Sequence, residues 1–268
     1  MTANASPISA ASCLVVRDRG EHGIEVLLVK RAAASRSFAD MWAFPGGKVD
    51  AADRHQANLL APSLMPAARP GMTSELLAYG IAGWRELLEE TCGDQALCHD
   101  PVHLATMLAH TIYWAHWVAP RESPLPFNTR FFLLDANILA HTPAPDGHEI
   151  SELRWLRPAE AVGEFLAGRL AAAPPTAFNL MELLAAAAMA GDTRQLLAQE
   201  QGRPIIRIQP RVDLRSTPHH SILPWDPRFA ALGTDLTADP PLQIPERYRD
   251  LPSRLQILNG VLTTARKC

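Results

Sequence analysis

The sequence is poor in several features, and each shortage excludes a class of protein. Its four cysteines among 268 residues have neither the paired spacing of a zinc site nor the density of a disulfide-rich domain. No stretch reaches about 18 uninterrupted apolar residues, so no membrane-spanning helix is expected. Residues 1–12 lack the charged start and long apolar run of a secretion signal. We therefore expect a soluble, cytoplasmic protein with no membrane partner.

The chain also lacks an excess of charge of either sign. Its formal net charge is -3, which gives no broad positive field for a nucleic-acid backbone. No nucleic-acid partner is therefore expected. Apolar residues make up 47% of the sequence, enough for a substantial core. A chain of this length fits one domain with an extension as well as it fits two domains.

One short segment concentrates charge. Arg85, Glu86, Glu89 and Glu90 fall within two turns of one expected helix, where residues three or four apart share a face. Neighbouring carboxylates repel each other unless they share a cation, and Mg2+ takes oxygen ligands from carboxylates and from substrate phosphates. Upstream, the turn 44–47 reads Phe-Pro-Gly-Gly, and its glycines permit close approach to a ligand. The pattern predicts a phosphate-processing site for Mg2+ or Mn2+.

These residues resemble the Nudix box, the signature of hydrolases that cleave a nucleoside diphosphate linked to another group. Gly47 is followed after five residues by Asp53, where the signature has Glu, and its second half runs from Arg85 to Gly93. Cys92 stands where a helix-ending glycine is expected, so we expect the helix stop to move one residue, to Gly93. The two halves are separated by residues 54–84 instead of seven residues.

The split box resembles the Nudix branch related to peroxisomal coenzyme A diphosphatases and their bacterial relatives. Segments 113–120 and 127–132 continue this resemblance, although Asn128 stands where an Asp is common in that branch, so its charge is missing. The resemblance implies an α/β fold, a Nudix-type α/β/α sandwich with a mixed sheet, over residues 10–190. It places an insert at 54–72 within the box and leaves a proline-rich C-terminal extension at 191–268.

Apolar patterning predicts the elements of this fold. A helix is expected from an N-cap at Ser74 through Thr91, and residues 54–72 are expected to form an excursion rich in Pro and Gly towards its end. The extension is expected to wrap on the main domain, or alternatively to contribute to a homodimer contact. The other expected elements are strands at 13–16, 24–29, 104–108, 112–118, 129–134 and 153–156, and helices at 158–167 and 176–189.

The resemblance also implies roles for individual residues. Glu86, Glu89 and Glu90, with the backbone carbonyl of Gly47, are expected to bind the metal, and Arg85 is expected to orient the cluster. Asp53 is a weaker candidate for support outside the metal ligands. Glu149 is the first choice for the general base and Glu152 the second, because a base must lie within hydrogen-bond reach of the attacking water.

The expected function is a Mg2+-dependent pyrophosphatase acting on a small-molecule nucleotide. Coenzyme A or an acyl-coenzyme A would give 3′,5′-ADP and a phosphopantetheine product. The alternatives are an ADP-ribose or NADH-type dinucleotide pyrophosphatase, and a non-catalytic nucleotide-sensing module. Arg36, Phe44 and Gly46 are the candidate substrate-binding residues, with an ordinary exposed loop arginine as the alternative for Arg36.

Overall fold

The computed structural model describes residues 7–20, 23–35, 38–68, 71–120, 123, 126–217, 219–232, 244–248, 250–258 and 261–264. The strands are β1 (Ile8–Asp18), β2 (Ile24–Arg31), β3 (Trp42–Ala43), β4 (Gly46–Lys48), β5 (Thr111–Val118), β6 (Phe127–Asp135), β7 (Ile150–Leu156), β8 (Arg207–Ile208), β9 (Arg211–Asp213), β10 (His220–Ile222), β11 (Arg254–Leu258) and β12 (Val261–Thr264). The α-helices are α1 (Ala51–Leu64), α2 (Ser74–Glu90), α3 (Pro101–His110), α4 (Pro158–Leu166), α5 (Pro174–Ala188) and α6 (Thr193–Glu200).

Strands β1 to β8 form one mixed sheet. Its order is β3-β2-β1-β6-β5-β8, with β4 pairing β1 and β7 pairing β2. The β1–β6 and β5–β8 pairs are parallel, and the other pairs are antiparallel. Strands β9 to β12 form a second, antiparallel sheet. The expected α/β architecture with a mixed sheet is confirmed.

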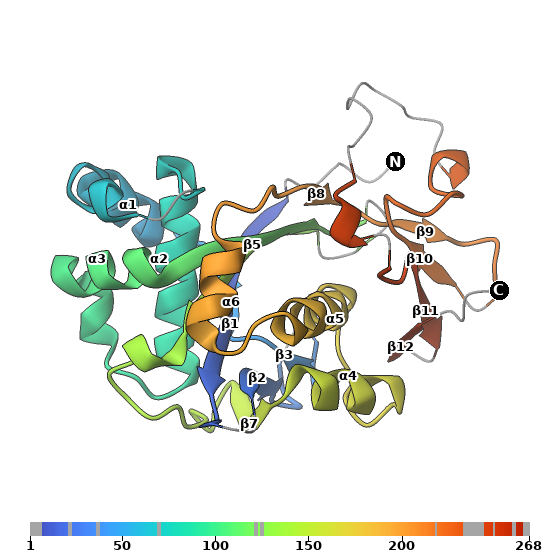
Figure 1. Ribbon diagram of the computed structural model, residues 1–268, viewed down its shortest axis with the longest axis horizontal. Helices are drawn as coiled ribbons and strands as arrows, with labels where there is room; N and C mark the ends of the chain where they lie inside the picture. Colours follow the sequence, from blue (N-terminus) through green and yellow to red (C-terminus); the bar gives the residue numbers. More distant parts are fainter. Residues whose placement is uncertain are drawn as a thin grey trace.

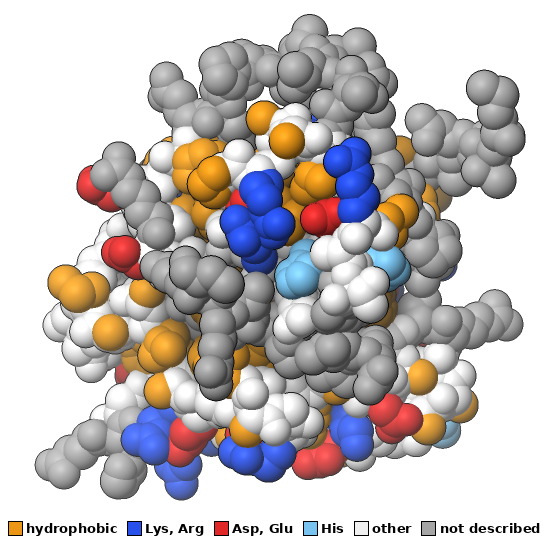
Figure 2. Space-filling model, turned by 90° about the vertical axis from the view of Figure 1, so that its right-hand side faces the viewer, with side chains coloured by type: hydrophobic (Ala, Val, Ile, Leu, Met, Phe, Trp, Pro, Cys, Tyr) orange, Lys and Arg blue, Asp and Glu red, His pale blue; other side chains and the backbone are white. Residues whose placement is uncertain are grey.

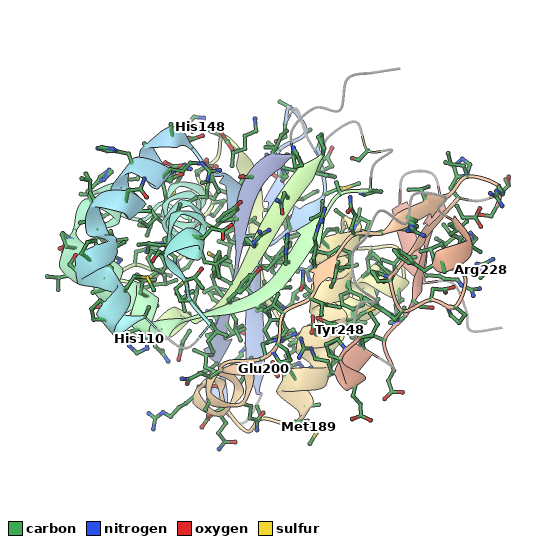
Figure 3. All side chains as sticks on the ribbon, turned by 90° about the horizontal axis from the view of Figure 1, so that it is seen from above. His110, His148, Met189, Glu200, Arg228 and Tyr248 are labelled. Atoms are coloured by element: carbon green, nitrogen blue, oxygen red, sulfur yellow. The ribbon has the colours of Figure 1, made fainter. Side chains whose placement is uncertain are left out.

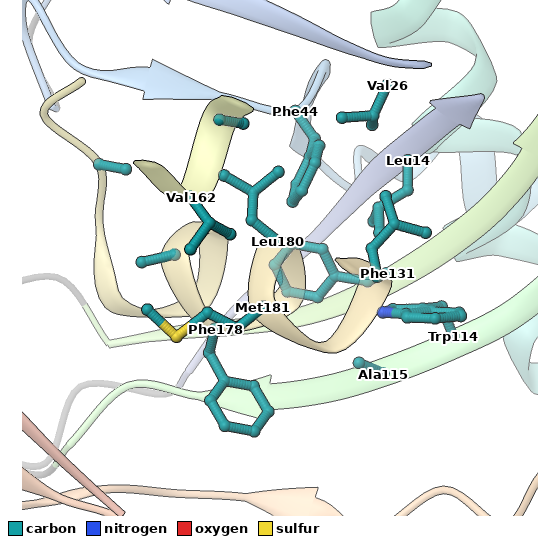
Figure 4. Packing of buried hydrophobic residues seen from close by; sticks show 14 of the residues in the cluster. Leu14, Val26, Phe44, Trp114, Ala115, Phe131, Val162, Phe178, Leu180 and Met181 are labelled. Atoms are coloured by element: carbon teal, nitrogen blue, oxygen red, sulfur yellow. The ribbon is translucent and has the colours of Figure 1, made fainter. Parts of the chain in front are cut away.

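Helices cover both faces of the large sheet (Figure 1). Because side chains alternate along a strand, Leu14 and Val16 of β1 enter one core cluster while Cys13 and Val15 enter the other. The first cluster includes side chains of α4, α5 and α6, and Figure 4 shows its packing around Phe131. The second includes side chains of α1, α2 and α3. The resulting α/β/α sandwich is the expected one.

Helix α2 buries the apolar stripe that its sequence predicts. It begins at Ser74, and the side chain of Thr73, not that of Ser74, caps it by accepting a hydrogen bond from the backbone N–H of Leu76. The expected stop at Gly93 is wrong: Cys92 itself takes the left-handed conformation, with φ 56°. The N–H of Gly93 then bonds the carbonyl of Leu88 at 2.8 Å, as in a Schellman motif. The buried stripe comprises Leu76, Leu77, Ile81, Trp84, Leu87 and Leu88.

The strand expected at 104–108 is wrong, because this segment lies within α3. Asp100 caps the helix by accepting from the N–H of Val102, and Pro101 occupies its first position. The buried residues Leu104, Met107 and Leu108 are three and four positions apart, so the apolar run has helical rather than alternating periodicity.

The segment between the halves of the split motif is also largely helical. The expected excursion at 54–72 begins as part of α1, whose Ala57 and Leu64 are buried in the cluster formed with α2 and α3. Pro62 lies inside the helix, close to its C-terminal end. The segment therefore adds to the layer of helices on the α2 face of the sheet.

Described residues beyond 191 pack against α5 on one face of the large sheet. Trp225 and Tyr248 stack with ring centroids 5.0 Å apart, and both rings contact Phe178 of α5. Seen from above, Tyr248 lies on the opposite side of the sheet from α1 (Figure 3). The buried side chain of Arg203 forms an ion pair with Glu182 of α5, and its guanidinium lies 3.9 Å from the centre of the Trp114 ring. None of the helices in the described ranges is long and apolar enough to cross a membrane.

Candidate active site

The Gly46–Gly47 turn brings the end of α2 against the sheet. A Cβ atom at Gly46 would lie 2.3 Å from the carbonyl oxygen of Ala11, so only glycine fits there. The N–H of Gly46 donates to Glu90 Oε2 at 3.0 Å. A Cβ atom at Gly47 would lie 2.3 Å from the carboxyl carbon of Glu86. The two glycines therefore let two carboxylates of α2 contact the backbone of β4.

Arg85 holds the charged cluster together. Its Nε and Nη2 donate to the two oxygens of Asp53, both at 3.1 Å. Its Nη1 lies 2.9 Å from Glu89 Oε2 and 3.1 Å from Glu86 Oε1, and its Nη2 also donates to the carbonyl of Lys48. One guanidinium thus joins α1, α2 and β4, and bidentate pairing with a carboxylate fixes its plane.

Asp53 connects the two separated halves of the motif. It is 2% exposed, and besides holding Arg85 it accepts the backbone N–H of Asp50 at 2.8 Å, which caps α1. A carboxylate that accepts from both a helix start and an arginine is fixed in orientation. This geometry indicates that Asp53 supports Arg85. The roles of Asp53 and Arg85 in catalysis stay predictions.

The carboxylates differ in their exposure and protonation. Glu90 is 3% exposed, and burial, with the nearby charge of Glu86, raises its pKa to about 8. Burial also raises the pKa of Glu86 to about 7, against the opposing influence of Arg85. Glu89 is more exposed than either. Buried carboxylates with raised pKa values are stabilised when a cation compensates their charge.

Arg31 supplies one such charge, and sequence reasoning missed it. It ends β2, and its Nη1 lies 3.7 Å from Glu90 Oε1. Its proximity depends on the pairing of β2 with β3 and on the turn between β3 and β4, which residue spacing does not reveal. The only available sequence signal was a basic residue directly after a buried apolar strand.

The carboxylate oxygens of this cluster suit a divalent cation, although they do not converge on a single point. Glu86 and Glu90 present hard oxygen donors beside Gly47, which is the ligand chemistry that Mg2+ requires. Within the described ranges, no three His, Cys, Asp or Glu side chains converge as a metal site. Arg85 draws Glu89 and one oxygen of Glu86 towards itself. Binding a cation would therefore require these side chains to rearrange around it.

The candidate bases lie at the side of this cluster. Glu149 is exposed on the loop before β7, and its charge contributes to the raised pKa values of Glu86 and Glu90. Its backbone carbonyl accepts from Ala32 at 2.8 Å, which anchors the loop. Glu152 lies within β7, opposite Lys30, and is exposed. The electrostatic contact favours Glu149 over Glu152 as the group nearer to the carboxylates.

The candidate substrate-binding residues have different surroundings. Phe44 is 2% exposed, and its ring meets that of Phe131 edge-on within the core. The backbone N–H of Gly46 already donates a hydrogen bond to Glu90. Arg36 lies outside the described residues.

Comparisons with known proteins found relatives of the sequence and of the fold. No protein-family model matches the chain. In an alignment 178 positions long that covers 59% of this chain, the sequence is 28% identical to a protein named putative nudix hydrolase 7 from Caenorhabditis elegans. The matched chain spans 55% of that protein's length. The fold is similar to a crystal structure of a NUDIX hydrolase from Alicyclobacillus acidocaldarius, with a TM-score of 0.60, 23% identity, and coverage of 75% of this chain and 100% of that one.

Proposed function

We propose that this protein is a metal-dependent Nudix hydrolase that cleaves the diphosphate bond of a nucleoside diphosphate derivative. The observation that carries the proposal is a pair of carboxylates, the half-buried Glu86 and the buried Glu90, held against the Gly46–Gly47 turn. Similarity of sequence and fold to Nudix hydrolases supports it. In this proposal residues 10–190, with the insert at 54–72, form the catalytic unit, and residues 191–268 form its extension.

The proposed roles follow from the contacts. Glu86, Glu89, Glu90 and the carbonyl of Gly47 would hold Mg2+ or Mn2+, and Arg85 keeps two of these carboxylates oriented. A bound divalent ion supplies charge neutralisation on the phosphates and lowers the pKa of a ligated water. Glu149 would accept the proton of the attacking water, since its charge reaches the cluster and it is exposed to solvent.

The proposed substrate is coenzyme A or an acyl-coenzyme A, cleaved to 3′,5′-ADP and a phosphopantetheine product. The resemblance of the split motif and of segments 113–120 and 127–132 to the coenzyme A diphosphatase branch supports this choice. ADP-ribose and NADH are the alternative substrates. The protein would act on these small molecules in the cytoplasm, and we propose no nucleic-acid partner, which agrees with the mixture of basic and acidic side chains on the face in Figure 2.

The test is hydrolysis of a substrate panel with Mg2+ by the unmodified protein and by two variants. The panel contains coenzyme A, ADP-ribose and NADH, and phosphate-bearing products are separated by chromatography. Glu86→Gln and Glu90→Gln keep the shape of each side chain and remove its charge. Because loss of a group outside the metal ligands already costs roughly 10–100-fold, we expect each variant to lose about 100-fold or more in kcat/KM.

Glu75→Gln is the matched control, since it makes the same change at an exposed position in the first turn of the same helix. Its kcat/KM should stay within about twofold of the unmodified protein, as expected for a surface substitution. Hydrolysis that survives both Glu86→Gln and Glu90→Gln would contradict the proposed site. Tight nucleotide binding without any hydrolysis would favour the nucleotide-sensing alternative.

A further inference from the structure

The loop at residues 139–149 leads into β7 and carries Glu149 as its last residue. Burial raises the pKa values of Glu86 and Glu90, and the charge of Glu149 raises both further, so Glu149 acts on the carboxylates of α2. The side chain of Glu149 is itself exposed, so burial does not fix its place. The contacts that hold the loop therefore decide where this carboxylate lies.

The loop is attached to the end of α2 through Thr91. The side chain of His141 contacts that of Thr91, with 2.8 Å between Nε2 and Oγ1. Three residues further along the loop, the N–H of Ala144 donates to the carbonyl of Thr91 at 3.2 Å. Thr91 directly follows Glu90, the last residue of α2, and is fully buried. The loop that ends at Glu149 is thus joined to the helix that carries the other carboxylates.

The hydroxyl of Thr91 determines the direction of its bond with His141. This hydroxyl donates its own hydrogen to the carbonyl of Leu87, one turn back in the helix, so its oxygen is left to accept. His141 Nε2 therefore carries the proton and donates. The other ring nitrogen, Nδ1, is buried and has no hydrogen-bond partner among the described residues. Burial lowers the pKa of His141, so the ring is neutral at neutral pH.

Gly93 provides the space that the ring of His141 occupies. The left-handed conformation at the end of α2 belongs to Cys92, and φ of Gly93 is not positive, so the backbone does not require glycine there. A Cβ atom at position 93 would lie 2.8 Å from Cε1 of His141 and 2.5 Å from Cδ2 of Leu88. Close packing against these two side chains is therefore the reason for glycine at this position.

The far end of the loop is held by other bonds. The carboxylate of Asp146 accepts the backbone N–H groups of His148, Glu149 and Ile150 at 3.0, 3.1 and 2.8 Å, which makes this end one rigid turn. The carbonyl of Glu149 also accepts from the N–H of Ala32, which follows β2. The turn therefore lies between the end of β2 and the end of α2. Its distance from α2 depends on the contacts with Thr91.

We propose that His141 and Thr91 are positioning residues, whose hydrogen bond holds the 139–149 loop against α2 and sets the distance from the carboxylate of Glu149 to the carboxylates of that helix. The catalytic purpose of this bond rests on the proposed function, in which Glu149 accepts the proton of the attacking water. A base must lie within hydrogen-bond reach of that proton. The bond therefore affects proton transfer and leaves substrate binding unchanged.

Four variants separate the hydrogen bond from the bulk of its two side chains. His141→Phe keeps a ring without the donor, and Thr91→Val keeps a branched side chain without the hydroxyl. His141→Gln keeps an N–H donor, and Thr91→Ser keeps the hydroxyl. His148→Phe is the matched control, since it makes the same change at an exposed position of the same loop (Figure 3). Circular dichroism checks that each variant is folded.

Hydrogen exchange of the Ala144 amide, followed by NMR in the full chain without substrate, measures how well the loop is held. Loss of one neutral hydrogen bond should speed this exchange about tenfold in His141→Phe and in Thr91→Val. The two conservative variants and His148→Phe should stay within about threefold of the unmodified protein. Unchanged exchange in His141→Phe would overturn the proposal, and so would exchange in His141→Gln that is as fast as in His141→Phe.

Initial rates with Mg2+, on the substrate of the panel that is cleaved, test the catalytic purpose. His141→Phe and Thr91→Val should each lower kcat about tenfold and leave KM within about twofold, since the bond acts after substrate has bound. The double variant should lose no more than either single variant, because both remove the same bond. A rise in KM with kcat unchanged would overturn the proposal.

A second cycle shows whether the bond acts through Glu149. When Glu149→Gln has already removed the base, His141→Phe should lower the residual kcat by less than about twofold. The same tenfold loss in both backgrounds would overturn the proposal, because the bond would then act on another group. Full kcat in Glu149→Gln would overturn it as well.

Exchange and kinetics together distinguish failure of this proposal from failure of the proposed function. Faster exchange in His141→Phe, in a protein that hydrolyses nothing in the panel, would refute the hydrolase and with it the catalytic purpose of the bond. Hydrolysis that requires Glu86 and Glu90, with kcat unchanged in His141→Phe, would keep the hydrolase and overturn the positioning role.

Discussion

Because there is little room beside Gly47, we expect a specific effect from Gly47→Ala. The added Cβ would lie 2.3 Å from the carboxyl carbon of Glu86 and 2.4 Å and 2.5 Å from its oxygens. Since ordinary carbon contacts begin near 3.5 Å, the carboxylate must move by about 1 Å. A displacement of that size in a reacting group can cost about 100-fold in rate. We expect kcat/KM for diphosphate hydrolysis to fall by about that factor.

Stability should change much less than activity in Gly47→Ala. The three atoms nearest to the new methyl group all belong to the end of the flexible Glu86 side chain, so the free energy of unfolding should stay within about 1 kcal/mol of its original value. Urea unfolding measures this quantity, and initial rates with Mg2+ measure activity.

Gly80→Ala is the matched control, because it lies on α2 and a Cβ there would meet nothing within 4 Å. Alanine within a helix should raise the free energy of unfolding by about 0.5–1 kcal/mol and leave kcat/KM unchanged. Full activity in Gly47→Ala would refute the reasoning that the position of Glu86 controls catalysis. An equal loss of activity in Gly80→Ala would refute it as well.

Three further predictions concern the rest of the fold. Arg203→Met leaves the buried Glu182 with Arg247 as its remaining partner among the described residues and should lower the free energy of unfolding, measured in urea, by about 3 kcal/mol. Cys92→Gly should raise the thermal midpoint, since glycine relieves about 1 kcal/mol of left-handed strain; a lower midpoint would contradict this. His116 has a pKa of about 4 when folded and 6.5 ordinarily, so below pH 6.5 the unfolded chain binds more protons. Stability should therefore fall from pH 6.5 to 4 more steeply than in His116→Gln, and parallel urea titrations would contradict the contribution of this histidine.

The sequence predicted features that depend on local periodicity. The spacing of Leu77, Ile81 and Trp84 predicted the buried stripe of α2, and the four-residue spacing of Arg85 and Glu89 predicted a contact that the structure shows at 2.9 Å. Both depend only on helical geometry.

Features that depend on competing local signals or on strand register were not predictable in this way. The run at 104–108 is apolar enough for a strand, and only the cap at Asp100 and the three-to-four spacing of its buried residues show a helix. Cys92 takes a conformation that glycine normally supplies, because the N–H of the following Gly93 closes the helix onto Leu88. The alignment of Arg130 with His116 arises from the pairing of strands and from the bulge in β5.

The bond between Asp53 and Arg85 has a consequence for how this chain tolerates change. Residues 54–84 separate the two partners along the sequence, yet the guanidinium and the carboxylate meet in the fold through two hydrogen bonds. Lengthening or shortening the connection after α1 would therefore leave the acidic residues of α2 in place, provided that the hydrogen bonds between Asp53 and Arg85 still form. The two residues are far apart along the chain but close in space. The connection between α1 and α2 can therefore vary in sequence without loss of the site.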